Sequence, residues 1–87
     1  MNTVAKQKKQ LVSILSQITD QSLMSKFLDD ILTPAEFNEL AARLELVKLL
    51  EAGMSQRDIS KKLGVSISKI TRGSRVLQSG SKGFKNV

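Results

Sequence analysis

Residues 56–77 read QRDISKKLGVSISKITRGSRVL, and this stretch decides the fold. Apolar residues recur at helical spacing on both sides of Gly64, which predicts two short amphipathic helices joined by a turn. Small Ser60 falls where the two helices approach each other, and Gly64 falls where the turn needs a positive φ. The positions predicted to face inward are Ile59, Leu63, Val65 and Ile70. The pattern is that of a helix-turn-helix, a unit that reads DNA.

The excess positive charge lies in the same part of the chain. Residues 1–53 carry six Lys and Arg against seven Asp and Glu, a net charge of −1, whereas residues 54–87 carry eight against one, a net charge of +7. A basic surface on one element is typical of phosphate binding, because each neutralised phosphate releases a counterion. A solvated helical face would explain Lys61 and Lys62, but not the further basic residues around one hinge: Arg57, Lys69, Arg72 and Arg75. The charge therefore favours double-stranded DNA as a partner.

Composition excludes several other classes of function. The 87 residues include no cysteine and no histidine, which argues against disulfides, thiol chemistry and metal sites and fits a cytoplasmic location. Asp29 and Asp30 are adjacent but face different directions on a helix, and the sequence shows no group of residues suited to a catalytic base, a nucleophile or a metal, so we expect no enzyme. No segment approaches the roughly 20 apolar residues of a membrane span. The apolar run after Lys9 is broken by serines and lacks a cleavage site, so no signal peptide is expected.

The hydrophobic period is close to 3.6 throughout, so the chain is predicted to be all-α. Five helices are expected, over residues 4–18, a segment ending at Leu32, residues 34–52, a segment from Gln56 to the Gly64 turn, and residues 67–77. Thr33, Pro34 and Glu36 form a predicted capping box at the start of the third helix. Gly53 is its predicted stop, and Ser55 and Ser66 are predicted caps of the two hinge helices.

On charge and periodicity, the chain divides into three parts of one domain. Residues 1–53 are predicted to form a helical dimerisation core, residues 54–77 the reading head, and residues 78–87 a flexible C-terminal tail. Phe84 could instead dock a short helical turn. The third helix is apolar around most of its circumference, and a chain this short buries little surface, so oligomerisation is expected.

Several short runs resemble the tryptophan repressor family: Leu32–Glu36, Ala42–Leu44, Met54–Asp58 and Ile70–Ser74. The last run contains Thr-Arg-Gly-Ser after a helix-turn-helix, which is the most specific of these signals. The resemblance covers about residues 32–77. It implies an intertwined helical homodimer that represses transcription, with two reading heads in successive major grooves.

The resemblance also implies L-tryptophan as a corepressor, and no other cofactor is expected. It places the ligand between the dimer core and the reading head, with Arg72 at its carboxylate, Arg43 flat against its indole ring and Gly73 leaving the ring room. The carbonyls at the end of the second helix, near Leu32 and Thr33, would hold the ammonium group. The alternative interpretation is that both arginines pair with acids of the core or contact phosphate.

The residues that match the family's DNA contacts are Gln56, Arg57, Ser66, Ile67, Ser68, Lys69, Thr71 and Arg72. Gln56 and Arg57 suit phosphate, whereas the first turn of the second hinge helix would present Ile67, Ser68 and Lys69 to base edges. Short side chains there favour water-mediated contacts and contacts with thymine methyl groups. Ile67 could instead pack in the core.

The chain departs from the family in three places. Val76 stands where well-studied members have a serine near the ligand's amino group, the link from Arg43 to Ser55 is one residue shorter, and the chain stops before a further helix. Because valine cannot form a hydrogen bond, weaker tryptophan binding is expected. The alternatives are a ligand-independent DNA-binding regulator of the same fold, a recombinase accessory factor, or a helical protein- or membrane-interaction module that uses the basic first helix.

Overall fold

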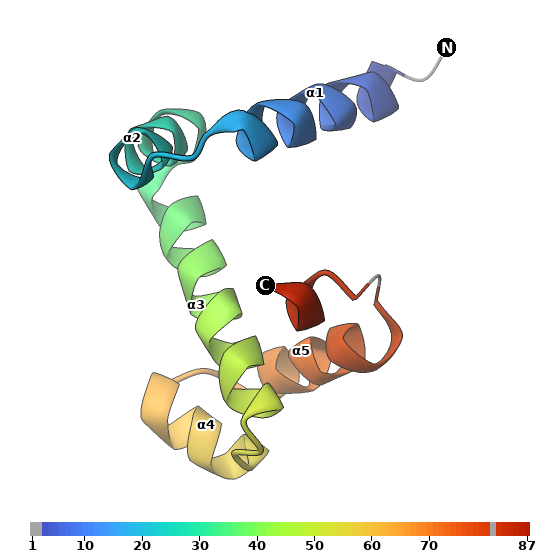
Figure 1. Ribbon diagram of the computed structural model, residues 1–87. Helices are drawn as coiled ribbons and strands as arrows, with labels where there is room; N and C mark the ends of the chain where they lie inside the picture. The colour runs from blue at the N-terminus through green and yellow to red at the C-terminus, as the bar shows by residue number, and fades with distance from the viewer. Residues whose placement is uncertain (1–2, 81) are drawn as a thin grey trace. The chain divides into compact units, whose positions relative to one another are not determined.

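The computed structural model describes residues 3–80 and 82–87 (Figure 1). These residues form five α-helices and one short 3-10 helix, with no β-strand among them, so the all-α prediction is confirmed. The elements in chain order are α1 (Thr3–Gln17), α2 (Gln21–Ile31), α3 (Pro34–Glu51), α4 (Gln56–Leu63), α5 (Ile67–Ser79) and η1 (Phe84–Asn86). The chain forms two compact units, one that ends at Phe37 and one that begins at Asn38.

The first unit has almost no core of its own. The Asp20 carboxylate accepts a hydrogen bond from the Leu23 amide at 3.0 Å, which satisfies one of the free N–H groups at the start of α2. Neither α1 nor α2 contains a buried residue, and large apolar side chains of both helices are exposed: Val4, Leu11, Val12, Ile14, Leu23 and Ile31. The amphipathic faces of these helices are therefore left open by a single chain.

α3 begins with the predicted capping box. The Glu36 carboxylate accepts a hydrogen bond from the Thr33 amide at 2.8 Å, and the Thr33 hydroxyl accepts one from the Glu36 amide at 3.2 Å. The backbone and then the side chain of Thr33 lower the pKa of Glu36, because hydrogen bonds to the carboxylate favour its ionised form. The box therefore keeps its charged acceptor until the pH falls below the ordinary range of a glutamate.

The predicted stops and caps of the second unit are also confirmed. Gly53 follows α3 with a φ of 90°, and Gly64 ends α4 in the left-handed region with a φ of 65°. The Ser55 hydroxyl accepts a hydrogen bond from the Asp58 amide at 3.1 Å. The Ser66 hydroxyl accepts one at 3.3 Å from the amide three residues further on. These local signals fix where α3, α4 and α5 begin or end.

The second unit has a small core built from three helices. The buried apolar side chains are Leu46 and Val47 of α3, Ile59 of α4 and Ile70 of α5. Ile59 and Ile70 are 0% exposed, which confirms the inward positions predicted for the hinge. Partly buried apolar side chains pack around these four: Leu49, Leu50, Met54, Leu63, Val65, Leu77 and Phe84. This cluster holds α4 and α5 against the C-terminal half of α3.

α5 lies very close to α3 at Gly73. A Cβ atom added to Gly73 would lie 2.5 Å from Leu46 Cδ2 and 3.6 Å from Leu50 Cδ1. The first distance is shorter than any ordinary contact, so a larger residue would force the buried Leu46 side chain to move. Gly73 therefore sets the distance between the two helices.

The residues after α5 fold back on the second unit. α5 continues to Ser79, and η1 packs against the core through Phe84. The sequence allowed either a flexible tail over residues 78–87 or a short helical turn docked through Phe84, and the structure has the docked turn. The sequence division at residue 53 follows the change in charge, whereas the division by contacts falls inside α3.

Candidate nucleic-acid interface

α4 and α5 are joined by the three residues Gly64, Val65 and Ser66, and the two helices pack on each other. The Ser60 hydroxyl donates a hydrogen bond to the Val65 carbonyl at 2.8 Å. This bond ties the last turn of α4 to the connection and satisfies a carbonyl that the turn leaves without a helical partner. The reading head is thus held by a polar contact at the turn and by the apolar cluster beneath it.

The inward apolar stripes leave the basic side chains of the reading head on its surface. The exposed basic residues of α4 and α5 are Arg57, Lys61, Lys62, Lys69, Arg72 and Arg75. Within the described residues, none of them forms an ion pair with an acid, and the only acid on these two helices is Asp58. Their charge is therefore available to an external anion such as the phosphates of DNA.

The candidate DNA-contact residues lie at the start of both helices and along α5. Gln56, Arg57, Ser66, Ile67, Ser68, Lys69 and Arg72 are exposed, and Thr71 is partly buried. Ile67 is 49% exposed, so it does not pack in the core. The Ser66 hydroxyl oxygen already caps α5, but its O–H group can still donate to a ligand. The first turn of α5 thus presents short side chains and one lysine.

Three of the candidate ligand residues, Arg43, Arg72 and Gly73, belong to the second unit. Both arginines are exposed, and in the described part of the chain neither pairs with an acid. The alternative interpretation, in which the two arginines form salt bridges with acids of the core, therefore finds no support in the described residues. Gly73 is buried against Leu46, a packing role that the sequence did not indicate.

The other two, Leu32 and Thr33, belong to the first unit. The Leu32 amide donates to the Leu28 carbonyl at 3.0 Å and ends α2. Thr33 is already engaged in the capping box with Glu36. The Thr33 carbonyl also accepts a hydrogen bond, at 3.0 Å, from the Phe37 amide. Both amides, the Thr33 hydroxyl and the Thr33 carbonyl therefore already take part in helix ends, so a cation at Thr33 would have to share its carbonyl.

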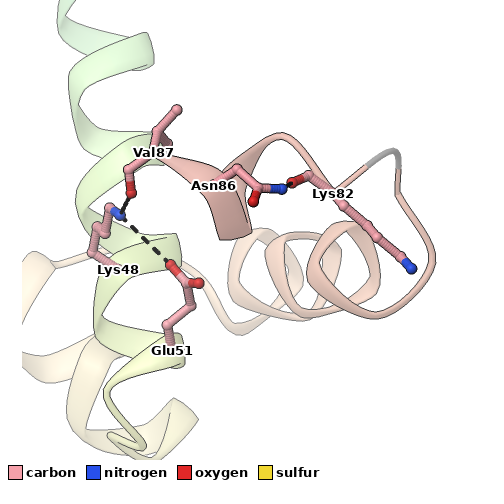
Figure 2. A network of polar contacts seen from close by, with 5 residues as sticks. All are labelled: Lys48, Glu51, Lys82, Asn86 and Val87. Atoms are coloured by element: carbon pink, nitrogen blue, oxygen red, sulfur yellow. Dashed lines mark hydrogen bonds and ion pairs between the residues drawn. The ribbon is translucent and has the colours of Figure 1, made fainter.

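Two residues outside the predicted sites connect distant parts of the second unit. The Lys48 ammonium donates a hydrogen bond to the carbonyl of Val87, 39 residues away (Figure 2). Phe84 packs against the core cluster. No periodicity or motif identifies Lys48, because its partner is so distant in the sequence. Phe84 does have a signal, since it is a large apolar residue in an otherwise polar segment.

The described residues offer little to other kinds of site. They contain no group of three or more acidic residues that could hold a metal ion. No helix among them is long and apolar enough to cross a membrane. A hollow of about 390 Å³ lies beside the end of α5, lined by Val76, Leu77, Lys82, Gly83, Phe84, Lys85 and Val87.

The family of this chain follows from comparison with known proteins. The family described as "Trp repressor protein" matches residues 6–87. The chain belongs to the Trp repressor family. The match includes most of α1, all of α2 and the C-terminal residues, which the short motifs between residues 32 and 77 did not cover. As a member of a repressor family, the chain is a regulator, and the prediction that it is no enzyme is confirmed.

Several curated relatives carry the name Trp operon repressor homolog. The one from Vibrio cholerae serotype O1 is 40% identical over 78 residues, which are 88% of this chain and 76% of the relative. The one from Vibrio parahaemolyticus serotype O3:K6 is 38% identical over 79 residues, 90% of this chain and 77% of the relative. The one from Xylella fastidiosa strain M23 is 42% identical over 69 residues, 78% of this chain and 75% of the relative. No solved structure matches significantly.

Proposed function

We propose that this member of the Trp repressor family is a cytoplasmic homodimer that binds DNA sequence-specifically, represses transcription and uses L-tryptophan as its corepressor. The observation that carries the proposal is the reading head, a packed hinge whose exposed basic side chains have no acidic partner in the described residues. The names of the relatives, Trp operon repressor homolog, support the same regulatory role.

In the proposed complex, α5 enters the major groove and α4 crosses the DNA backbone. Arg57, at the start of α4, neutralises a phosphate, which holds the protein on any sequence. Lys69 lies in the first turn of α5 and is long enough to reach base edges beside Ile67. The positive end of the α5 dipole adds to the attraction for phosphate.

Two substitutions are expected to separate phosphate contact from base contact. Arg57→Ala should weaken binding to all duplexes by a similar factor, because phosphates carry no sequence information. Lys69→Ala should instead change the order of preference among duplexes, by about 1–3 kcal/mol at the base pair it contacts. Fluorescence anisotropy on a panel of duplexes measures both effects, with Lys26→Ala on α2 as a control that removes the same charge. If Lys69→Ala only scaled all affinities equally, its base-reading role would be wrong.

A second copy of the chain is proposed to cover the apolar surface that one copy leaves open. α1 and α2 contain no buried residue, and Leu40 and Leu44 of α3 are 45% and 44% exposed. Soluble monomers seldom expose so many large apolar side chains, because burying each would release unfavourable hydration. A symmetric dimer would also carry two reading heads, as a DNA site with two half-sites requires.

Sedimentation equilibrium is expected to give twice the chain mass at micromolar concentration. Leu44→Glu should shift the protein towards the monomer, because burying an unpaired carboxylate in the interface would reduce the free energy of dimerisation by roughly several kcal/mol. Gln78→Glu adds one carboxylate at an exposed position of α5, the same change in net charge, and serves as the control. A compact monomer of the unaltered chain under these conditions would contradict the dimer and, with it, the pair of reading heads.

L-tryptophan is proposed to bind with its carboxylate on Arg72 and its ring against Arg43. Both guanidinium groups are exposed and free of acidic partners in the described residues, so each can pair with a ligand carboxylate or stack on a ring. Tryptophan can raise DNA affinity only by favouring the DNA-competent orientation of the reading head over others. Gly73 lies next to Arg72 in the sequence and packs α5 against α3, so a larger residue there should also alter the proposed site.

Val76→Ser is expected to tighten L-tryptophan binding about fivefold, which corresponds to one hydrogen bond worth about 1 kcal/mol. Val76 is 41% exposed on α5, so a serine hydroxyl there could reach a ligand without disturbing the core. Isothermal titration calorimetry measures the change. Val76→Ala is the matched control, because it removes the same methyl groups without adding a hydroxyl. Equal affinities for the serine and alanine variants would show that residue 76 does not face the ligand's amino group.

Val76 also favours a second candidate, a ligand-independent DNA-binding regulator of the same fold. A valine at this position offers no hydrogen bond to a ligand's amino group. This candidate predicts no heat on titration with millimolar L-tryptophan and the same DNA affinity with and without it. The first candidate predicts a change in both.

A further inference from the structure

The residues that follow α5 form a defined structure at 82–87, which we call the C-terminal clasp. Its internal hydrogen bonds run from the Asn86 side-chain amide to the Lys82 carbonyl at 2.8 Å and from the Asn86 amide to the Gly83 carbonyl at 3.2 Å. Lys82 has a φ of 69°, a left-handed conformation that costs free energy for a residue with a side chain. Such a conformation persists only where surrounding contacts determine it.

The first anchor of the clasp is apolar. Phe84 is partly buried and packs against the cluster formed by α3, α4 and α5. Leu77, in the last turns of α5, packs against the same cluster. Because Phe84 and Leu77 pack against the same cluster, the clasp and the end of α5 are both attached to the core that α3 helps to form.

The second anchor is polar and lies on α3. Figure 2 shows the Lys48 ammonium between the Glu51 carboxylate and the Val87 carbonyl. The ion pair with Glu51 is 3.8 Å long and partly exposed, so it adds little stability but holds the ammonium towards the clasp. The hydrogen bond from Lys48 therefore fixes the far end of the clasp to α3.

The clasp does not pack continuously against the end of α5. The hollow of about 390 Å³ separates it in part from Val76 and Leu77 of α5. The attachment of the clasp therefore depends on Phe84 and Lys48 rather than on a continuous packed face. Loss of either anchor should release most of the segment.

We propose that the C-terminal clasp fixes the end of α5 against α3 and so sets the angle at which the DNA-reading helix leaves the core. The proposal rests on the proposed function, because it concerns the same helix in the same role. It makes Phe84 and Lys48 positioning residues that lie away from the predicted DNA contacts. Because the N-terminal turn of α5 meets the bases, a small rotation at the other end of this helix displaces the contacts with DNA.

Amide hydrogen exchange of the free protein tests the positioning directly. In Phe84→Ala, the exchange rate of residues 75–79 and 82–87 is expected to rise about tenfold or more, because a partly buried aromatic contact is lost. The exchange rate of α4 should stay unchanged. Phe84→Leu keeps an apolar anchor and should remain close to the unaltered chain. Unchanged exchange in residues 75–79 of Phe84→Ala would overturn the proposal.

The polar anchor is tested by a pair of substitutions that also covers the case in which Phe84→Ala does not fold. Lys48→Met removes the hydrogen bond to Val87 and should raise exchange in residues 82–87 and at the end of α5. Lys48→Arg keeps a donor of similar reach and should restore protection. If methionine and arginine gave the same exchange, the hydrogen bond would not hold the clasp.

DNA binding of the same variants separates failure of the clasp from failure of the proposed function. Phe84→Ala changes no charge, so it should weaken binding to a specific duplex about tenfold while leaving the salt dependence unchanged. If Phe84→Ala raised the exchange rate at the end of α5 but left the DNA affinity unchanged, the proposed role of the clasp in DNA binding would be overturned. If the unaltered chain bound no DNA, the proposed function would fail, whereas the exchange result would still decide whether the clasp fixes α5.

Discussion

Ile70→Ala is expected to lower the free energy of unfolding by about 2–5 kcal/mol, the usual cost of truncating a buried isoleucine. Ile70 is 0% exposed, and among the described residues its core contains three other buried apolar side chains, from α3 and α4. A small domain has a total stability of about 5–15 kcal/mol, so this loss is a large fraction of it. The reading head should lose its packing first, because Ile70 joins it to α3.

Urea denaturation followed by circular dichroism measures this change. Ile70→Val is the control, since it removes one methylene group and should cost about 0.5–1.5 kcal/mol. A midpoint for Ile70→Ala equal to that of Ile70→Val would mean that the three-helix cluster does not stabilise the reading head. Both measurements require one fixed protein concentration, because a dimer's stability depends on it.

The affinity for DNA is expected to fall about 1,000-fold between about 50 and 200 mM salt. On a random-sequence duplex without L-tryptophan, Lys69 has no matching base to read and Arg72 has no ligand carboxylate to bind, so both are expected to neutralise phosphates beside Arg57. These three basic residues occur twice in a dimer, which gives about six neutralised phosphates and a slope of log K against log salt near −5. Arg57→Ala should reduce the slope by about 2, one contact in each copy. Anisotropy titrations on a random-sequence duplex measure both. A slope shallower than about −2 would contradict phosphate binding by paired reading heads.

The parts of the fold that could be predicted from the sequence are those specified by nearby residues. The capping box of Thr33 and Glu36 and the caps Ser55 and Ser66 each act over three residues. The positive φ of Gly64 is likewise a property of one turn. The inward positions Ile59 and Ile70 follow from helical periodicity, which a short amphipathic helix shows plainly.

Contacts between distant residues could not be predicted in this way. The close approach of Gly73 to Leu46 depends on how α5 crosses α3, and no local pattern encodes that crossing. The hydrogen bond between Lys48 and Val87 joins residues 39 positions apart. The candidate ligand residues present the same difficulty, because they range from Leu32 to Gly73 in the sequence, and only the family resemblance, not a local pattern, groups them.

For the exposed residues of the candidate interface, the sequence predicts the exposure but not the contact that each residue makes. Helical periodicity places Lys69 and Arg72 on the outside of α5, and the structure agrees with that exposure. Whether they contact a base or a phosphate depends on the docking of the helix in the groove, which neither periodicity nor burial determines. The roles assigned to them accordingly remain predictions for experiment.

The measurement that tests the central claim most directly is the affinity of the protein for DNA with and without L-tryptophan. A duplex selected by the protein from a random pool is the probe, and anisotropy at fixed salt is the readout. Millimolar L-tryptophan is expected to raise the affinity about fivefold or more, the lower range of allosteric coupling, and Arg72→Ala should lose this response while still binding DNA. The same affinity with and without L-tryptophan, together with no heat of binding, would contradict the account of a tryptophan-controlled repressor.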